Sequence, residues 1–223
     1  MRSKLRRGRA IAAIVAAAIL TAVLVLTVVA DNGVLPGNDE MPASGVVATV
    51  NGVEITQADV VELRALHETT YDRSIPPEAA LEQLIMMEVV YQAAESGDYL
   101  PTAEETRERL EAQLDMMGMT MDDFEEMLEE RGLCYDEQIE DFRRELAMQD
   151  YLQDAVAVPE ITEEEVREFY EDWKQTLPAE QDPPSFEDME EQIIMHLQQE
   201  KQQEATFDLI DGLIEAASIE EYP

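Results

Sequence analysis

The apolar residues of this chain recur mainly at helical spacing. One face is spaced at i, i+4, i+7 and i+11 and consists of Tyr135, Ile139, Phe142 and Leu146. This spacing predicts an amphipathic helix over residues 135–156. Further along, the apolar face widens to take in Met148, Tyr151, Leu152 and Ala155. We therefore expect the end of this helix to contact neighbours on two sides. On the polar face, Glu140 precedes Arg144 by four residues, which predicts an ion pair along the helix.

Two similar corners precede this helix. Gly118 and Gly132 are each followed by an apolar residue, a short N-cap candidate, a second apolar residue and two acids. A glycine ends a helix readily because it adopts the left-handed conformation without strain. Thr120 and Cys134 then occupy the N-cap positions of the next helices. The pattern predicts a short helix over residues 121–131 between the two corners.

Capping signals predict five further helices. They begin at Thr56, Pro76, Thr102, Thr162 and Ser185. The helix that follows Pro76 and stops near Gly97 is apolar nearly all round, which is typical of the central helix of a bundle. The last helix, which runs to about residue 217, is apolar at both ends and polar over residues 198–204. This arrangement predicts that the last helix bridges two separate packing sites.

Short β-branched segments predict a small β element. Residues 46–50 and 53–55 flank Asn51-Gly52, and this dipeptide between β-branched runs is a strong hairpin signal. Residues 219–222 are expected to form a short strand that pairs with the hairpin and so brings the two ends together. The predicted fold class is therefore mainly α, with an N-terminal hairpin and a C-terminal strand.

The N-terminal segment has the features of a membrane anchor. Residues 10–30 contain only two polar residues, Thr21 and Thr27, and as a helix they would span about 30 Å, the thickness of a hydrocarbon core. The basic residues before this run favour a cytoplasmic N-terminus, with everything after Asp31 outside. The alternative is a cleaved signal peptide, since Val28-Val29-Ala30 is a tolerable cleavage site. We therefore divide the chain into an anchor or signal (1–30), a flexible linker (31–45) and a helical domain (46–223).

The charge of the chain excludes several classes of partner. It carries 15 basic and 51 acidic residues, for a formal net charge of −36. Such a charge repels nucleic acid and anionic lipid, so neither is expected to bind the soluble part. The single cysteine, Cys134, excludes an intramolecular disulfide and a cysteine-based zinc site.

The sequence contains no catalytic constellation. His67 and His196 are the only histidines, and neither lies three to five residues from a second histidine or cysteine. The acidic group at residues 122–130 lacks the spaced acids and glycine of a calcium loop. No Gly-rich phosphate loop and no serine nucleophile motif occurs. We therefore expect no enzyme activity, no cofactor and no metal.

Methionines gather around Gly118 and allow more than one interpretation. They are Met116, Met117, Met119, Met121 and Met127. Packing around the corner is one interpretation, contact with client polypeptides is another, and Cu(I) binding is a third. We expect Met117 to pack in the core as a continuation of the stripe through Leu110 and Leu114. The candidate client-binding residues are Met119, Met121, Phe124, Met127, Phe169 and Trp173.

Taken in order, residues 46–222 resemble the SurA/PrsA family of exported chaperones. The resemblance comprises the segment from Val46 to Thr56 after an export segment, the apolar helix over residues 81–94 and the two glycine corners. It continues through Phe142-Arg143-Arg144-Glu145-Leu146, the cap Ile161-Thr162-Glu163-Glu164-Glu165 and the closing helix with its strand. It implies a helical chaperone module in which the C-terminal helix and strand return to the N-terminal half.

The resemblance also implies a function and shows one departure. Family members often carry a parvulin prolyl isomerase domain between the Thr162 helix and the last helix, where this chain has only about a dozen loop residues. No catalytic residue can therefore be carried over. We expect a membrane-anchored, extracytoplasmic, ATP-independent holdase that binds unfolded exported polypeptides and lacks isomerase activity. The alternative is a dedicated membrane-tethered adaptor that docks one folded partner.

Overall fold

A three-stranded antiparallel sheet joins the two ends of the described chain. The computed structural model describes residues 45–177 and 183–222. The strands β1 (Val46–Val50), β2 (Val53–Thr56) and β3 (Ile219–Glu221) lie in the order β2-β1-β3. Asn51 and Gly52 supply the positive φ angles, 51° and 90°, that the tight turn between β1 and β2 requires. The predicted hairpin and the predicted pairing of the C-terminal strand are both confirmed.

Seven helices surround and extend from this sheet in the described part of the chain. They are α2 (Gln57–Tyr71), α3 (Pro77–Ser96), α4 (Ala103–Met116), α5 (Met121–Glu130), α6 (Tyr135–Ala155), α7 (Glu163–Thr176) and α8 (Phe186–Ala216). Reciprocal capping boxes begin four of them, at Thr56, Thr102, Thr120 and Thr162. Cys134 occupies the N-cap of α6 as expected, but its side chain makes no capping bond.

The largest core lies around α3, which contacts α2, α6, α8 and β1. Its buried residues come from the sheet and from three helices: Ala48, Val50, Ile55, Ile85, Met86, Val89, Val90, Met148 and Ile210. The central position predicted for this apolar helix is therefore confirmed. The predicted ion pair between Glu140 and Arg144 is wrong, because Arg144 instead lies at the α3–α6 interface. There its Nη2 donates to Glu88 Oε2 (3.0 Å), and its guanidinium lies 4.0 Å from the Tyr91 ring centroid.

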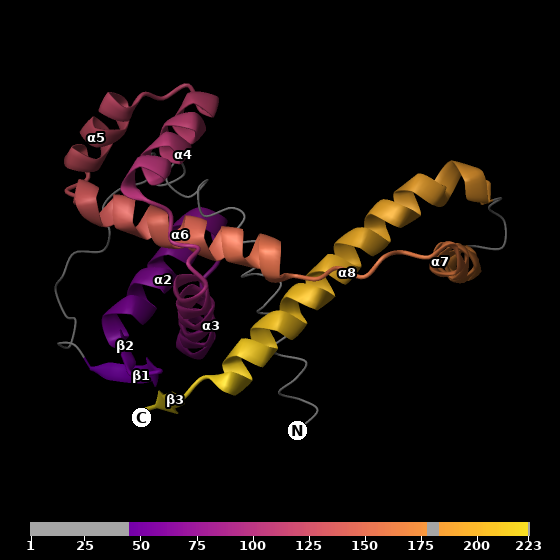
Figure 1. Ribbon diagram of the computed structural model, residues 1–223, viewed down its shortest axis with the longest axis horizontal. Helices are drawn as coiled ribbons and strands as arrows, with labels where there is room; N and C mark the ends of the chain where they lie inside the picture. Colours follow the sequence, from indigo (N-terminus) through magenta and orange to yellow (C-terminus); the bar gives the residue numbers. More distant parts are fainter. Residues whose placement is uncertain (1–44, 178–182, 223) are drawn as a thin grey trace.

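Two smaller cores lie away from the sheet. The first joins α4, α5 and α6 through Leu110, Leu114, Phe124, Leu128, Phe142 and Leu146, and we call it the α4–α6 core. The second joins α7 to the first half of α8 through Val166, Tyr170 and Ile193, and we call it the arm core. Figure 1 shows the result: a body holds the sheet and α2–α6, and an arm made of α7 and the start of α8 projects from it.

The helix α8 belongs to both parts. Its 31 residues give it a length of about 46 Å. Ile193 packs in the arm core, whereas Ile210 is fully buried in the main core. The prediction that this helix bridges two packing sites is confirmed.

The predicted membrane segment, residues 10–30, and all but the last residue of the predicted linker, 31–45, lie outside the described residues. Within residues 45–177 and 183–222, no helix combines the length and the apolar character that crossing a membrane requires.

Candidate functional site

Two of the predicted client-binding residues, Met119 and Met121, lie at the corner between α4 and α5. The helix α4 ends in a Schellman motif, in which the Met119 N–H donates to Leu114 O (2.9 Å) and the Gly118 N–H donates to Asp115 O (3.0 Å). Gly118 has a φ of 72°, a left-handed conformation that favours glycine. We call residues 116–121 the methionine corner.

The methionine corner presents thioethers to solvent. Met116 is 82% exposed and Met117 is 37% exposed. Met119 and Met121 are partly buried and pack against the α4–α6 core. The four side chains therefore form a mixed surface, in which two are anchored at one end of a helical core and two are open.

The expectation that Met117 continues the stripe of Leu110 and Leu114 into the core is wrong. Met117 is the C-cap of α4, is 37% exposed and is not among the side chains that pack on the α4–α6 core, because α4 ends here and the chain reverses at Gly118. Met116 is absent from the predicted set, although it is the most exposed of these residues. Met116 follows Leu114 by two residues, which places it off the apolar face of α4, and this spacing in the sequence could have predicted its exposure.

Phe124 and Met127 lie on the next helix, α5. Phe124 is 2% exposed and makes an edge contact with Tyr135, with ring centroids 6.3 Å apart. Met127 is partly buried against the same α4–α6 core. This burial favours a packing role for Phe124, which supports the corner from beneath rather than forming its surface.

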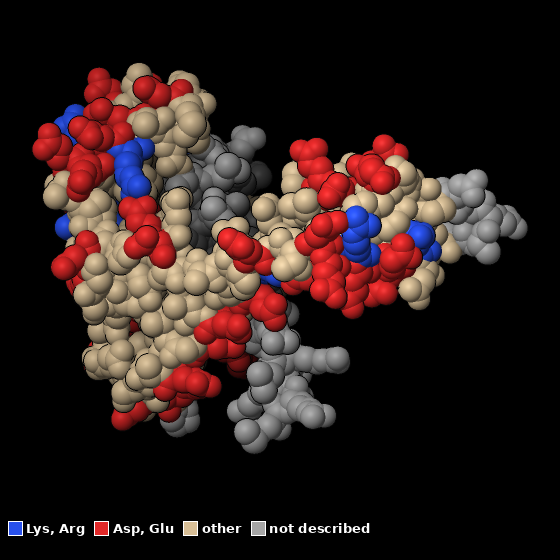
Figure 2. Space-filling view, turned by 45° about the vertical axis from the view of Figure 1, so that its right-hand side comes forward, with Lys and Arg blue, Asp and Glu red and all other residues tan. Residues whose placement is uncertain are grey.

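The surroundings of the methionine corner are strongly acidic. Between Arg109 and Arg131 the sequence holds eight acidic residues and no lysine, arginine or histidine. Hydrogen bonds from the side chain and backbone of Thr120 hold the pKa of Asp123 below its ordinary value. Figure 2 shows acidic side chains in red over the α4–α5 end of the molecule, next to uncharged surface in tan.

The remaining predicted residues, Phe169 and Trp173, lie in the arm. Both are partly buried and pack against the arm core. The ring of Phe169 lies 5.1 Å from that of His196, and the ring of Trp173 lies 6.1 Å from that of Tyr170. The six predicted residues therefore fall into two groups, one on the α4–α6 core and one on the arm core, rather than into one site.

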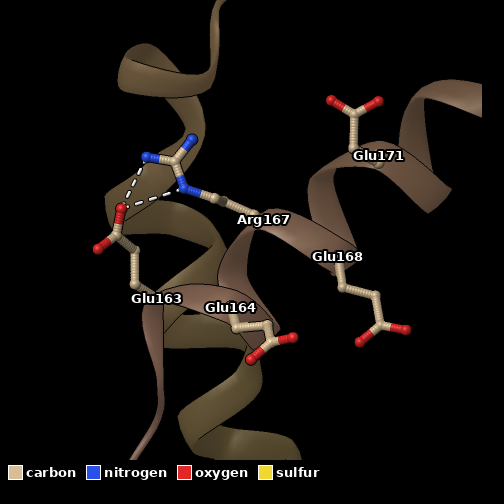
Figure 3. A pocket seen from close by; sticks show the side chains of 5 residues that line it. All are labelled: Glu163, Glu164, Arg167, Glu168 and Glu171. Carbon is tan, nitrogen blue, oxygen red and sulfur yellow. Dashed lines mark hydrogen bonds and ion pairs between the residues drawn. The ribbon is translucent and has the colours of Figure 1, made fainter.

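A shallow hollow of about 540 Å³ lies along α7. The residues that line it all come from this one helix and are Glu163, Glu164, Arg167, Glu168 and Glu171. Figure 3 shows the one ion pair among them, in which Arg167 Nη2 donates to Glu163 Oε1 (2.7 Å) while the other carboxylates point away. The hollow offers no nucleophile and no histidine, so its geometry is that of a solvated acidic face.

The two histidines do not form a metal or catalytic centre. His67 is buried in the body, where its Nε2 lies 3.1 Å from Oε1 of the buried Gln83. His196 lies on the arm, 3.8 Å from Glu200. Within the described residues, no group of three His, Cys, Asp or Glu side chains is placed to hold a metal ion.

The structure reveals one unusual carboxyl group that the sequence analysis did not single out. Glu145 lies on α6, three residues from Phe142 and three from Met148, both of which are buried. Its Oε1 is buried and has no hydrogen-bond partner among the described residues. Desolvation raises its pKa to about 7. The burial of Glu145 could have been predicted from the sequence, because an apolar residue lies three positions before it and another three positions after it.

The comparisons with known proteins concern the fold. No protein-family model matches the sequence, and no curated protein matches it. The structure is similar to a solved chain from work on the virulence factor PEB4 and the periplasmic protein Cj1289, two structurally related SurA-like chaperones of Campylobacter jejuni. The TM-score is 0.59 at 12% sequence identity, and the match covers 80% of this chain and 99% of that chain.

The similarity establishes the fold of the chain. The protein is mainly helical with a small three-stranded sheet, and its architecture resembles that of the solved SurA-like chaperone chain. The fold that the sequence resemblance implied, with the C-terminal helix and strand returning to the N-terminal half, is confirmed.

Proposed function

We propose that this protein is a membrane-anchored, extracytoplasmic, ATP-independent chaperone that holds unfolded exported polypeptides. The observation that carries the proposal is the match of the described fold to nearly the whole of a solved SurA-like chaperone chain. The exposed thioethers of Met116 and Met117 add support, because flexible methionine side chains repack around unlike apolar partners with little strain.

The mechanism is reversible burial of apolar client segments. A client side chain that covers part of the methionine corner gains about 25 cal/mol for each Å² of apolar surface removed from water. A few such contacts give weak, rapidly reversible binding, which suits a protein that delays aggregation and then releases its client. The net charge of −36 keeps the loaded complex soluble, because neighbouring complexes repel one another.

The proposed chaperone has no prolyl isomerase activity. Related chaperones often insert a parvulin domain between the helices that correspond to α7 and α8. Here α7 ends at Thr176 and α8 begins at Phe186, so only residues 177–185 separate them. This spacing supports the proposal, and a prolyl isomerase assay with the purified protein is expected to show only the uncatalysed rate. Clear turnover would contradict it.

Membrane anchoring is proposed from the sequence of residues 1–30. The expected outcome is that the protein sediments with cell membranes and resists extraction by alkaline carbonate, with residues 10–30 still present in its intact mass. A protein found free outside the membrane without these residues would show instead that they are a cleaved signal.

The central test is an aggregation assay. The full chain, held in lipid nanodiscs, is mixed with a chemically unfolded exported protein, and light scattering is compared with that from empty nanodiscs. Suppression at stoichiometric amounts is the expected result, and its absence would refute the holdase function. Affinity capture from cell envelopes then separates the alternatives, since an adaptor would retain one stoichiometric folded partner and a chaperone many unrelated chains.

A further inference from the structure

The methionine corner has an uncovered apolar surface. Met116 is 82% exposed, so nothing in the described chain covers it, and Met117 beside it is 37% exposed. Met119 and Met121 pack their inner atoms on the α4–α6 core, so the corner is fixed at its base and does not need client binding to form. An apolar surface of this kind has no sequence preference by itself, because burial of apolar area is not directional.

Charge supplies the preference that apolar contact lacks. The four methionines are bracketed in the sequence by Asp115 and Asp122, which are both exposed. Neither carboxylate forms an ion pair with any residue that the structure describes. The nearest basic residues in the sequence, Arg109 and Arg131, lie outside the whole stretch. The corner is therefore an apolar surface bordered by two carboxylates that form no ion pair with the described residues.

This juxtaposition discriminates between kinds of client segment. A segment with acids beside its apolar residues is repelled, and a neutral segment gains only apolar burial. A segment with lysine or arginine on both sides of its apolar residues gains burial and ion pairing together. The hollow on α7 does not offer the same combination, because it is lined by four glutamates and Arg167, with no apolar side chain among them.

We propose that the methionine corner selects client segments in which a short apolar run is flanked on both sides by lysine or arginine. The preference rests on the proposed chaperone function and adds to it the class of polypeptide that this surface holds. Because the carboxylates are exposed, each ion pair contributes only modestly, and two or three of them together correspond to a preference of about 10-fold in Kd.

The test compares three fluorescent peptides of equal length for binding to the full chain in nanodiscs. The first has a leucine run flanked by lysines, the second has the same run flanked by glutamates, and the third has a serine run flanked by lysines. The lysine-flanked leucine peptide is expected to bind about 10-fold more tightly than either of the others. About 1 M salt, which shortens the Debye length to about 3 Å, is expected to remove most of its advantage over the glutamate peptide.

Variants then locate the binding. Met116→Ser with Met117→Ser is expected to weaken the lysine-flanked leucine peptide about 10-fold, whereas Met195→Ser, a control at a 56% exposed methionine of α8, should leave binding unchanged. Asp115→Asn with Asp122→Asn is expected to bring the lysine and glutamate peptides to similar affinity. All these side chains are exposed, so the melting temperature of each variant should equal that of the wild type. An unchanged melting temperature would show that a loss of peptide binding does not come from unfolding.

Each contrary outcome has a distinct meaning. Equal binding of the lysine-flanked and glutamate-flanked leucine peptides would overturn the charge preference, and equal binding of the serine peptide would overturn the apolar role. Loss of binding in the Met195→Ser control but not in the corner variants would place the surface elsewhere. In each of these cases the full chain would still suppress aggregation, whereas failure of the chaperone function itself would abolish both suppression and peptide binding.

Discussion

Glu145 makes the stability of this fold depend on pH. Its Oε1 is buried on α6 without a hydrogen-bond partner among the described residues, and desolvation raises its pKa from an ordinary 4.5 to about 7. The folded protein therefore holds a proton on Glu145 between about pH 4.5 and 7, where the unfolded chain has already lost it. Stability falls as the pH rises through this window, because folding must then either keep the proton or bury the charge.

The size of the effect follows from the same pKa. One pKa unit corresponds to about 1.4 kcal/mol, so the penalty above pH 7 reaches about 3 kcal/mol for a fully desolvated group. Glu145 is only half-buried as a residue, which reduces the expected value to about 2 kcal/mol. Below about pH 4.5 both states are protonated, and the penalty disappears.

The assay is chemical denaturation of the wild type and of Glu145→Gln between pH 4 and about pH 8, followed by circular dichroism. Glutamine mimics the protonated acid, so the two proteins should be equally stable near pH 4, and the variant should be about 2 kcal/mol more stable near pH 8. Glu129→Gln is the matched control, because Glu129 is exposed on α5 and should change neither curve. Burial and nearby carboxylates also raise the pKa of Glu62 and Asp141, so the variant should keep a residual slope.

Parallel curves for the wild type and Glu145→Gln would refute this reasoning. They would show that Glu145 has the same pKa in the folded and unfolded chain, and hence that water or a rearranged side chain solvates it in the folded protein.

Four further substitutions, one of them a control on α8, test how the corner and its core are held. Gly118→Ala is expected to cost about 1 kcal/mol of stability, because a side chain is strained at the φ of 72° that this residue adopts. Gly212→Ala, in the interior of α8, should instead stabilise the protein by about 0.5–1 kcal/mol. Equal shifts of the melting temperature in the two variants would contradict this difference. Phe124→Ala should lower the free energy of unfolding by about 3–5 kcal/mol, as measured by denaturation, and a loss below about 1 kcal/mol would mean that Phe124 is not core. Arg109→Ala breaks the bidentate pair with Asp150 (2.7 and 2.9 Å), yet its cost should stay below about 1 kcal/mol and shrink in high salt, because the pair is partly exposed.

The positions of the helices could be predicted because their ends are local. A capping box such as Thr102 with Glu105 closes within four residues, so the sequence contains both partners side by side. The corners at Gly118 and Gly132 are likewise formed within a short segment, because the helix before each glycine ends in a Schellman motif. At the second corner, the Leu133 N–H donates to Leu128 O (2.9 Å).

The surfaces of the molecule could not be predicted in the same way, because they depend on partners far along the chain. Arg144 bonds Glu88 from 56 residues away, and this contact displaced the local pair expected with Glu140. The side chain of Glu145 is desolvated only once α6 has packed into the fold. Its spacing from Phe142 therefore indicates burial but does not give the size of the pKa shift. Exposure at the methionine corner could not be predicted from spacing, because Met117 continues the i, i+4, i+7 series of Leu110 and Leu114 but lies at the end of α4, where it is 37% exposed.

The helix α8 connects the arm, which carries one group of candidate client-binding residues, to the body, which carries the other. Its first half packs with α7 and its second half with the sheet and α3, while residues 198–204 between them are polar. At this polar centre, Lys201 Nζ donates to Glu165 Oε1 (2.7 Å) and to Glu160 O (3.0 Å), which fixes the start of α7 on α8. The same bond is the largest cause of the fall in the Glu165 pKa to about 2. The start of α7 is thus fixed on α8 by a charged contact in addition to the apolar packing of the arm core, whereas the second half of α8 is held in the main core by apolar burial, so each group of candidate residues lies on its own core.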